Sequence, residues 1–229
     1  MPLLELVNIR LALQEKTILD ELSFQVDSGD IIGLLGTSGS GKTSLFRMIN
    51  LLQSPTQGTV LYRGKDTLTY QPTTLRREIG YVFQKTYLFG DTIKENLIYP
   101  YQLLKQEPDF QEITDYLAKA NLPQDIITKK INELSGGEQQ RIALIRSLLV
   151  KPHILLLDEV TASLDEENTL IIEKLILDQH QTRNVTILFI SHNTQQAERL
   201  AQKILYLAKG RISFYGNKGE FFERGLNNE

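Results

Sequence analysis

A glycine-rich stretch between an apolar run and a helical pattern is the first part of this sequence that could do chemistry. Residues 36–43 read Gly-Thr-Ser-Gly-Ser-Gly-Lys-Thr and match G-x-x-x-x-G-K-[ST] at every defined position. The apolar run Ile31–Leu35 precedes the motif and the helical pattern Lys42–Leu52 follows it, as a phosphate-binding loop requires. A plain glycine-rich turn is the alternative, and the expected strand and helix on either side argue against it.

The chemistry of such a loop comes mainly from its backbone. Glycines let N–H groups point inward, and the N-terminus of the following helix adds a positive dipole end. We therefore expect Lys42 to reach the β- and γ-phosphates of a nucleotide and Thr43 to give its hydroxyl to Mg²⁺. The residues predicted to bind the nucleotide here are Gly36, Thr37, Ser38, Gly39, Ser40, Gly41, Lys42, Thr43 and Ser44.

Two carboxylates follow an apolar run in the second half of the chain. Asp158 and Glu159 come directly after Ile154–Leu157. Ligands of open parallel sheets bind at the carboxyl ends of the strands, so this pair would lie beside the phosphates. We expect Asp158 to hold Mg²⁺, directly or through its water, and Glu159 to polarise a water aimed at the γ-phosphate. Alone, such a pair would more often cap a helix, but the phosphate loop upstream favours the catalytic interpretation.

A second candidate phosphate surface opens the helical pattern Gly136–Val150. Leu134–Arg141 reads Leu-Ser-Gly-Gly-Glu-Gln-Gln-Arg, and Ser135 is a good N-cap, so plain capping is the simple alternative. Two consecutive glycines are costly for capping alone, but they let the backbone approach an anion. One nucleotide needs only one loop of the first kind. The sequence therefore predicts a dimer in which Ser135, Gly136 and Gly137 of one chain cover the phosphates held by the other.

These residues need a sheet that brings strand ends together, and the hydrophobic pattern predicts one. Apolar strands alternate with helices, which indicates an α/β fold with a buried, mostly parallel sheet, whereas residues from about 91 to 149 are helical. The predicted strands are Leu4–Leu11, Leu22–Val26, Ile31–Leu35, Thr59–Tyr62, Tyr81–Phe83, Ile154–Leu157, Val185–Ile190, Ile204–Leu207 and Arg211–Tyr215. The predicted helices are Lys42–Leu52, Pro108–Ala120, Gly136–Val150, Glu166–Gln179 and Thr194–Ala201.

Composition narrows the class of protein. The 229 residues suit one large domain or one domain with an inserted subdomain, and 41% hydrophobic with 23% charged residues is typical of globular chains. The net charge of −3 and the short basic pairs Arg76-Arg77 and Lys129-Lys130 argue against a nucleic-acid partner. The chain has no cysteine and three histidines, which excludes disulfides and cysteine-ligated metals. With no signal peptide and no membrane-spanning run, a cytoplasmic location is predicted, and any membrane spans belong to a partner.

At the octad Leu134–Arg141 the chain resembles the ATP-binding cassette (ABC) family, and the resemblance extends from about Leu4 to Gly216. It implies a P-loop NTPase of the ABC ATPase type that binds ATP and Mg²⁺. It also implies one domain over 1–229. Residues 1–85 and 151–229 would form the nucleotide-binding core with an antiparallel β subdomain, and about 86–150 an inserted α-helical subdomain carrying the signature.

The family's other motifs can be placed one by one. The resemblance implies that Gln84 binds Mg²⁺ together with Thr43 and Asp158. It implies that His192, in Ile190–Asn193, contacts the γ-phosphate and orients Glu159. The loop that crosses the dimer interface resembles Ser163–Asp165, which brings Asp165 to the nucleotide. Val160 replaces the usual proline before it, which changes loop stiffness. The implied catalytic residues are Glu159, His192, Gln84 and Lys42.

One position departs from the family pattern. Many members stack an aromatic ring on adenine, and aligning Lys16–Asp20 with them puts Leu13 at that place. Leucine covers a base by apolar contact without π-stacking, so weak base selectivity is expected. Phe24 is the alternative stacking ring.

The segment after Gln84 indicates the kind of cassette. In transporters of this family the permease docks at the equivalent of Leu88–Leu97, and aromatic side chains surround it here, either as an interface or as internal packing. With Leu122–Lys129, this segment resembles the ATP-binding subunits of the Fet-type (YbbL-like) iron exporters. The aromatic residues are Tyr87, Phe89, Tyr99 and Tyr101.

The predicted function is ATP hydrolysis that powers a separate membrane permease at the cytoplasmic face of the cell membrane, with metal export as the specific hypothesis. Alternatives are a cassette that powers or signals to a membrane complex without moving solute, and an importer subunit for phosphate or amino acids. Nucleic-acid cassettes usually carry two cassettes or a long coiled coil, for which Thr43 to Leu134 leaves no room. Asn217–Glu220 only faintly resembles a guanine-binding motif, and a GTPase is rejected.

Overall fold

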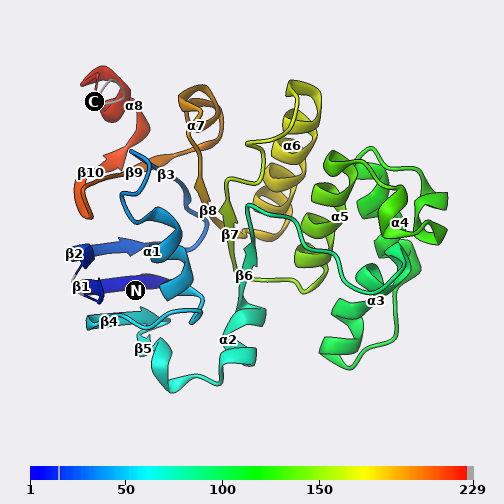
Figure 1. Cartoon of the computed structure of the whole chain (residues 1–229), viewed down its shortest axis with the longest axis horizontal. Helices are drawn as coiled ribbons and strands as arrows, with labels where there is room; N and C mark the ends of the chain where they lie inside the picture. The colour runs from blue at the N-terminus through cyan, green and yellow to red at the C-terminus, as the bar shows by residue number, and fades with distance from the viewer. Residues whose placement is uncertain (15, 226–229) are drawn as a thin grey trace.

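Two β-sheets position the phosphate-binding sequence and the other predicted site residues. The computed structural model describes residues 1–14 and 16–225. A six-stranded sheet has the order β10-β9-β3-β8-β7-β6, and a four-stranded sheet has the order β2-β1-β4-β5 (Figure 1). The larger sheet contains β3 (Ile31–Gly36), β6 (Ile79–Val82), β7 (Ile154–Asp158), β8 (Thr186–Ile190), β9 (Lys203–Ala208) and β10 (Arg211–Asn217). The smaller contains β1 (Leu4–Leu13), β2 (Lys16–Val26), β4 (Gln57–Tyr62) and β5 (Lys65–Asp66).

The larger sheet is mostly parallel, as the sequence predicts. Strands β9, β3, β8, β7 and β6 pair in parallel, and only the edge strand β10 runs antiparallel to β9. The smaller sheet is antiparallel throughout. The predicted α/β class with a mostly parallel core sheet and an antiparallel β part is confirmed.

Both faces of the parallel sheet are buried, which explains its continuous apolar runs. Along β7, Ile154 and Leu156 face one core together with β1, β2, β4 and helix α1 (Lys42–Ile49). Leu155 and Leu157 face the other core, formed largely by helices. All five residues of β7 are buried, including the charged Asp158 at its end.

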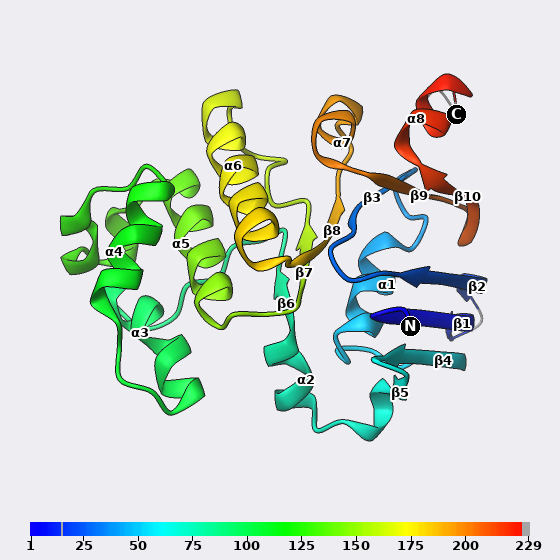
Figure 2. The same cartoon turned by 180° about the vertical axis from the view of Figure 1, so that it is seen from behind.

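Helices cover the second face and gather at one end of the molecule. Figure 1 and Figure 2 show α3, α4 and α5 together beyond α6, at the end opposite the antiparallel sheet. The remaining helices are α2 (Pro72–Glu78), α3 (Ile93–Leu104), α4 (Phe110–Lys119), α5 (Gly136–Leu149), α6 (Glu166–Arg183), α7 (Thr194–Leu200) and α8 (Lys218–Glu223). Short 3₁₀ turns occupy Thr67–Thr69, Gln124–Thr128 and Ile131–Glu133. Among the described residues, no helix is long and apolar enough to span a membrane.

Some element bounds differ from the sequence prediction. Helix α1 stops at Ile49 instead of Leu52, because Leu51 adopts a left-handed φ of 56°. The first two strands are longer than predicted, since they continue into a shared hairpin. Helix α8 follows β10 directly; its Phe221 is fully buried among aromatic rings.

Candidate nucleotide site

The strand order brings the predicted site residues to one edge of the sheet. Strands β3, β8, β7 and β6 are consecutive neighbours and parallel, so their carboxyl ends meet at the same edge. The loop 36–43 leaves β3, His192 follows β8, the acidic pair ends β7, and Gln84 follows β6. This is the edge at which open α/β sheets bind ligands.

The phosphate loop requires glycine at its two ends. Gly36 has φ 138°, and a Cβ there would lie 2.1 Å from the carbonyl oxygen of Leu207. Gly41 has φ 101°, and a Cβ would lie 2.4 Å from a methyl of Leu19. Gly41 is also the N-cap of α1 and has no side chain to cap the helix. The first N–H groups of α1 are therefore available to an anion.

The side chain of Lys42 turns back into the phosphate loop. This side chain is buried, and Nζ donates to the carbonyl oxygens of Gly36 at 2.8 Å and Thr37 at 2.9 Å. Burial lowers the pKa of Lys42, while the charges of Glu159 and Asp158 oppose that shift. The hydroxyl oxygen of Ser40 is buried and has no hydrogen-bond partner among the described residues. A desolvated ammonium and an unpaired hydroxyl inside a glycine loop fit a polyphosphate.

Asp158 connects the loop to β7. Its Oδ1 accepts a hydrogen bond from the hydroxyl of Thr43 at 3.2 Å, across 115 residues of sequence. Burial raises the pKa of Asp158, and the hydrogen bonds from Tyr81 and Thr43 act against that rise. A hydroxyl and a single carboxylate suit Mg²⁺, which keeps several waters and uses phosphate oxygens as further ligands. No group of three or more histidine, cysteine or acidic residues that could hold a metal ion occurs among the described residues.

Tyr81 is a site residue that the sequence argument missed. Its hydroxyl donates to Oδ2 of Asp158 at 2.7 Å, so both oxygens of that carboxylate are held. The ring stacks on Phe83 at 4.3 Å and meets Phe46 edge-on at 6.2 Å. Burial, followed by the bond to Asp158, raises the pKa of the Tyr81 phenol, which stays a proton donor. The sequence signal for this role was the hydroxyl of a tyrosine in an otherwise apolar strand, β6, which lies beside β7.

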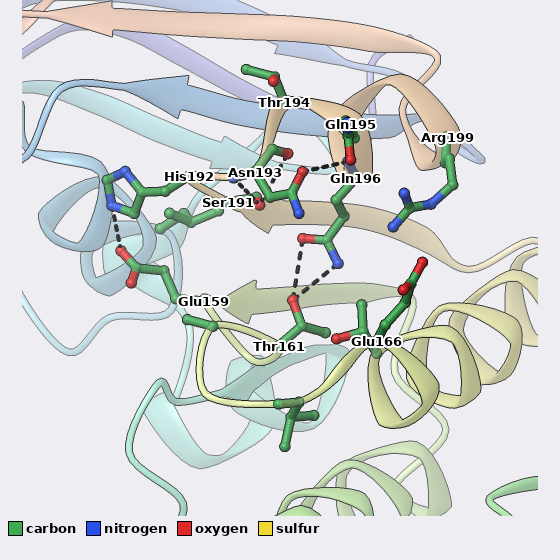
Figure 3. A pocket seen from close by; sticks show the side chains of 14 residues that line it. Glu159, Thr161, Glu166, Ser191, His192, Asn193, Thr194, Gln195, Gln196 and Arg199 are labelled. Atoms are coloured by element: carbon green, nitrogen blue, oxygen red, sulfur yellow. Dashed lines mark hydrogen bonds and ion pairs between the residues drawn. The ribbon is translucent and has the colours of Figure 1, made fainter.

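Glu159 lies between two of the predicted residues. Its Oε2 accepts from Nε2 of Gln84 at 2.7 Å, and its Oε1 is 3.0 Å from Nε2 of His192 (Figure 3). Glu159 itself adopts φ 49°, a left-handed backbone that turns the chain at the end of β7. Gln84 thus contacts Glu159 directly, and its role as a metal ligand stays a prediction.

Ser135 caps α5 in the way that the simple alternative predicted. Its backbone N–H donates to Oε2 of Glu138 at 2.8 Å, and its hydroxyl oxygen accepts from the Glu138 N–H at 3.3 Å, which is a reciprocal capping box. The Ser135 hydroxyl also donates to Oε2 of Glu138 at 2.7 Å. The hydrogen bonds from Ser135 lower the pKa of Glu138. A Cβ on Gly136 would meet no described atom within 4 Å, so this helix start is open to a ligand or a second chain. The two-chain site remains a prediction.

The predicted interface loop ends as a helix cap. Asp165 is exposed, and its Oδ1 accepts from the Asn168 N–H at 2.8 Å at the start of α6. Val160, in place of the usual proline, is buried in the core that contains the helices.

The two candidates for base contact differ in exposure. Leu13 is 48% exposed at the end of β1. Phe24 is buried and packs edge-on against Tyr215 at 5.6 Å. Phe24 is therefore excluded as an exposed stacking ring, and the contact of Leu13 with a base stays a prediction.

The aromatic residues after Gln84 divide between surface and interior. Tyr87 and Tyr99 are exposed, whereas Tyr101 is buried. Phe89 packs edge-on against Tyr99 at 4.9 Å and lies under the guanidinium of Arg146 from α5. This segment thus has an exposed aromatic surface, and the contact between Phe89 and Arg146 packs it against α5.

A cavity of about 760 Å³ extends from the acidic pair toward α6 and α7 (Figure 3). Its lining is largely polar and includes Glu159, Thr161, Ser191, His192, Gln196 and Arg199.

Comparisons with known proteins agree with this geometry. The family model "ABC transporter" matches residues 19–162. The chain is 39% identical over 206 residues to the "Probable iron export ATP-binding protein FetA" of Escherichia coli (strain K12), covering 90% of this chain and 91% of that protein. It is 38% identical to the "Tungstate uptake system ATP-binding protein TupC" of Peptoclostridium acidaminophilum, covering 90% and 94%.

A solved structure extends the likeness to the fold. The structure of a bacterial Atm1-family ABC exporter with ATP bound superposes with a TM-score of 0.87 at 29% identity. The match covers 98% of this chain and 40% of that exporter chain, so only the shared part is compared.

Proposed function

This chain belongs to the ABC transporter family as an ATP-binding, ATP-hydrolysing subunit, and we propose that it powers a separate membrane permease through the site at the ends of β3, β8, β7 and β6. The observation that carries this proposal is the hydrogen bond between Thr43 and Asp158. It joins the phosphate loop to the acidic pair, and these two parts together define a nucleotide-hydrolysing site.

The phosphate loop and Lys42 would hold the triphosphate. The free N–H groups at the start of α1 would bind phosphate oxygens, and Nζ of Lys42 would exchange the carbonyl oxygens of Gly36 and Thr37 for the β- and γ-phosphates. Thr43 and Asp158, with Gln84, would hold Mg²⁺, which when bound neutralises charge on the phosphates. Tyr81 would keep the Asp158 carboxylate in place.

Glu159 would accept the proton of the attacking water. In this structure Gln84 and His192 both occupy its carboxylate. Gln84 would therefore have to leave Oε2 before a water can take that position. His192 would keep Glu159 oriented and donate from its ring to the γ-phosphate. Catalysis of this kind is mostly positioning and charge stabilisation.

A second cassette would complete the site. ABC ATP-binding subunits pair with each other and with membrane components, and we assign the open helix start at Ser135, Gly136 and Gly137 to the partner's nucleotide, with Asp165 beside it. We also assign residues 86–150 to a helical subdomain. The exposed rings of Tyr87 and Tyr99 would face the permease. With these contacts, the chain would lie at the cytoplasmic face of a membrane.

Metal export is the specific transport hypothesis, supported by the similarity to an iron-export subunit. Uptake of an oxyanion is the second candidate, supported by the similarity to a tungstate uptake subunit and to the "Phosphate import ATP-binding protein PstB" of Saccharolobus solfataricus. Flux of both solute classes in vesicles that contain the chain and its permease would distinguish them.

The proposed role of Glu159 is tested by Glu159→Gln. This variant should bind ATP but hydrolyse it about 10²–10⁴-fold more slowly, because removing a positioned base costs that much. The closed ATP dimer should then accumulate on gel filtration. Glu78→Gln is the matched control, since Glu78, like Glu159, pairs with a histidine, here His153, and accepts a hydrogen bond from a neutral side chain, here Tyr62, but lies outside the site. Near-normal turnover by Glu159→Gln would remove Glu159 from the role.

A further inference from the structure

Two chain segments of the site are joined by two side-chain contacts. One segment is the turn after β7, and the other runs from the end of β8 into α7. The first contact is Glu159–His192 at 3.0 Å, in which the histidine side chain is half exposed. The second is Thr161–Gln196, in which Gln196 is 4% exposed. The exposed contact can rearrange when a nucleotide binds, whereas the amide of Gln196 is largely shielded from solvent.

Gln196 makes a complete set of hydrogen bonds in this position. Its Nε2 donates to the hydroxyl of Thr161 at 3.0 Å, and Thr161 lies 3.2 Å from its Oε1, so the pair can exchange roles (Figure 3). The same Nε2 donates to Oε1 of Glu173 on α6 at 3.1 Å. Its backbone N–H donates to the side chain of Asn193, which caps α7. The glutamine amide therefore connects the turn, α6 and α7.

Glu173 on α6 holds the amide nitrogen of Gln196 on the side away from Thr161. It is 4% exposed and accepts from Nε of Arg199 at 3.1 Å and from Nη2 at 2.8 Å. A carboxylate held by an arginine through two bonds has a defined orientation. Gln196 is thus held against α6, and it in turn holds Thr161.

The turn around Thr161 transmits this constraint to Glu159. The N–H of Ala162 donates to the carbonyl oxygen of Glu159 at 3.1 Å, and that of Leu164 donates to Thr161 at 3.1 Å. Glu159 has a left-handed backbone within the same turn. A shift of Thr161 would therefore rotate the Glu159 backbone and change the direction of its carboxylate.

We propose that Gln196 is a positioning residue for hydrolysis: through Thr161 it fixes the turn that carries Glu159 relative to the segment that carries His192. The proposal rests on the roles proposed above for those two residues. Gln196 lies in no phosphate loop, acidic pair or signature, and its side chain does not contact Glu159 or His192. It acts through the backbone and lines the cavity beside them.

Gln196→Met tests the proposal, because methionine has a similar length and no amide. We expect kcat to fall about 10- to 100-fold, since a misplacement of about 1 Å costs that order of rate. The KM and the Kd for ATP should stay unchanged, because the phosphate loop is not touched. Gln179→Met is the matched control: Gln179 is also buried and accepts from Tyr116 at 2.9 Å, but it lies outside the cavity. This control should lower the melting temperature and leave kcat near wild type.

Thr161 supplies a second, independent test. Thr161→Val removes the same hydrogen bond and should lower kcat to a similar degree, whereas Thr161→Ser keeps the hydroxyl and should retain most of the activity. The double variant Thr161→Val with Gln196→Met should be no slower than the slower single variant, because both substitutions remove the same hydrogen bond between Thr161 and Gln196. If Gln196→Met does not fold, the comparison of Val with Ser at 161 carries the test.

The outcomes separate this inference from the proposed function. If Glu159→Gln abolishes hydrolysis while Gln196→Met turns over as fast as Gln179→Met, the positioning role is wrong and the proposed function stands. Equal activity of the Val and Ser variants, or rate losses that multiply in the double variant, would also overturn it. If Glu159→Gln itself keeps full turnover, the proposed function fails first.

Discussion

The hydrogen bond from Tyr81 to Asp158 gives a prediction that the sequence motifs do not contain. Tyr81→Phe removes one oxygen and leaves the ring packed between Phe83 and Phe46. The carboxylate loses its 2.7 Å partner at Oδ2 and keeps only the 3.2 Å bond from Thr43 at Oδ1. Asp158 is 3% exposed, so water has little access to replace the phenol.

The size of the effect follows from that geometry. A hydrogen bond to a charged group contributes about 1.5–3 kcal/mol. The partners that orient metal-binding carboxylates typically account for about 10- to 100-fold in metal affinity or activity. Because Thr43 still holds one oxygen, we expect the lower end, about a tenfold rise in the Mg²⁺ concentration that gives half-maximal ATPase activity. Binding of ATP in EDTA should stay unchanged, since the phosphate loop does not involve Tyr81.

Tyr62→Phe is the matched control for this experiment. The hydroxyl of Tyr62 donates to a carboxylate of Glu78 at 3.1 Å, and its ring is buried away from the site. Both variants should lose stability in thermal unfolding, but only Tyr81→Phe should change the Mg²⁺ titration and the difference in fluorescent-ATP affinity between Mg²⁺ and EDTA. The same half-saturating Mg²⁺ concentration in both variants would refute the argument that Tyr81 holds a magnesium-binding carboxylate.

Two further predictions concern the base and the helix start. Leu13→Tyr should tighten ATP several-fold with little change in kcat, because stacking on a base contributes about 1–3 kcal/mol and the base does not change in the reaction; the wild type should discriminate ATP from GTP by less than about tenfold, or 1.4 kcal/mol. Equilibrium titrations measure both, and a strong ATP preference that Leu13→Tyr leaves unaltered would contradict the assignment. Glu138→Gln should lower the melting temperature at neutral pH, because the pKa of Glu138 is held below its usual 4.5 in the folded chain. A lowered pKa contributes stability above the unfolded-state pKa that is lost as pH falls through the folded-state pKa, so the melting temperatures of the two proteins should converge on acidification. A difference that does not shrink as the pH falls would contradict the charged capping box.

Local motifs were sufficient to predict the parts of the site that are contiguous in sequence. The loop 36–43, the pair Asp158-Glu159 and the histidine after β8 could be predicted because each follows an apolar strand, and parallel strands end at one edge. The order β3-β8-β7-β6 then brings them together.

Contacts between distant residues could not be predicted in the same way. Tyr81 and Asp158 are 77 residues apart, and Thr161 and Gln196 are 35 apart. Hydrophobic periodicity assigns faces and elements, but it contains no register between strands and no side-chain direction after a turn. The end of α1 depended on the left-handed Leu51, which no pattern around it indicates. The contact of Gln84 with Glu159 depends on a side-chain conformation that no sequence pattern encodes.

We propose that each ATP site is built from the phosphate loop of one chain and the Ser135 helix start of another. Lys42→Ala and Ser135→Arg should each inactivate the homodimer, because every site then carries one defect. A mixed dimer has one site with both defects and one with neither. Purified heterodimer, isolated with two different tags, should therefore regain ATPase activity, and an equal mixture should reach up to about a quarter of wild-type turnover. A heterodimer that forms but stays as inactive as either parent would contradict the shared site.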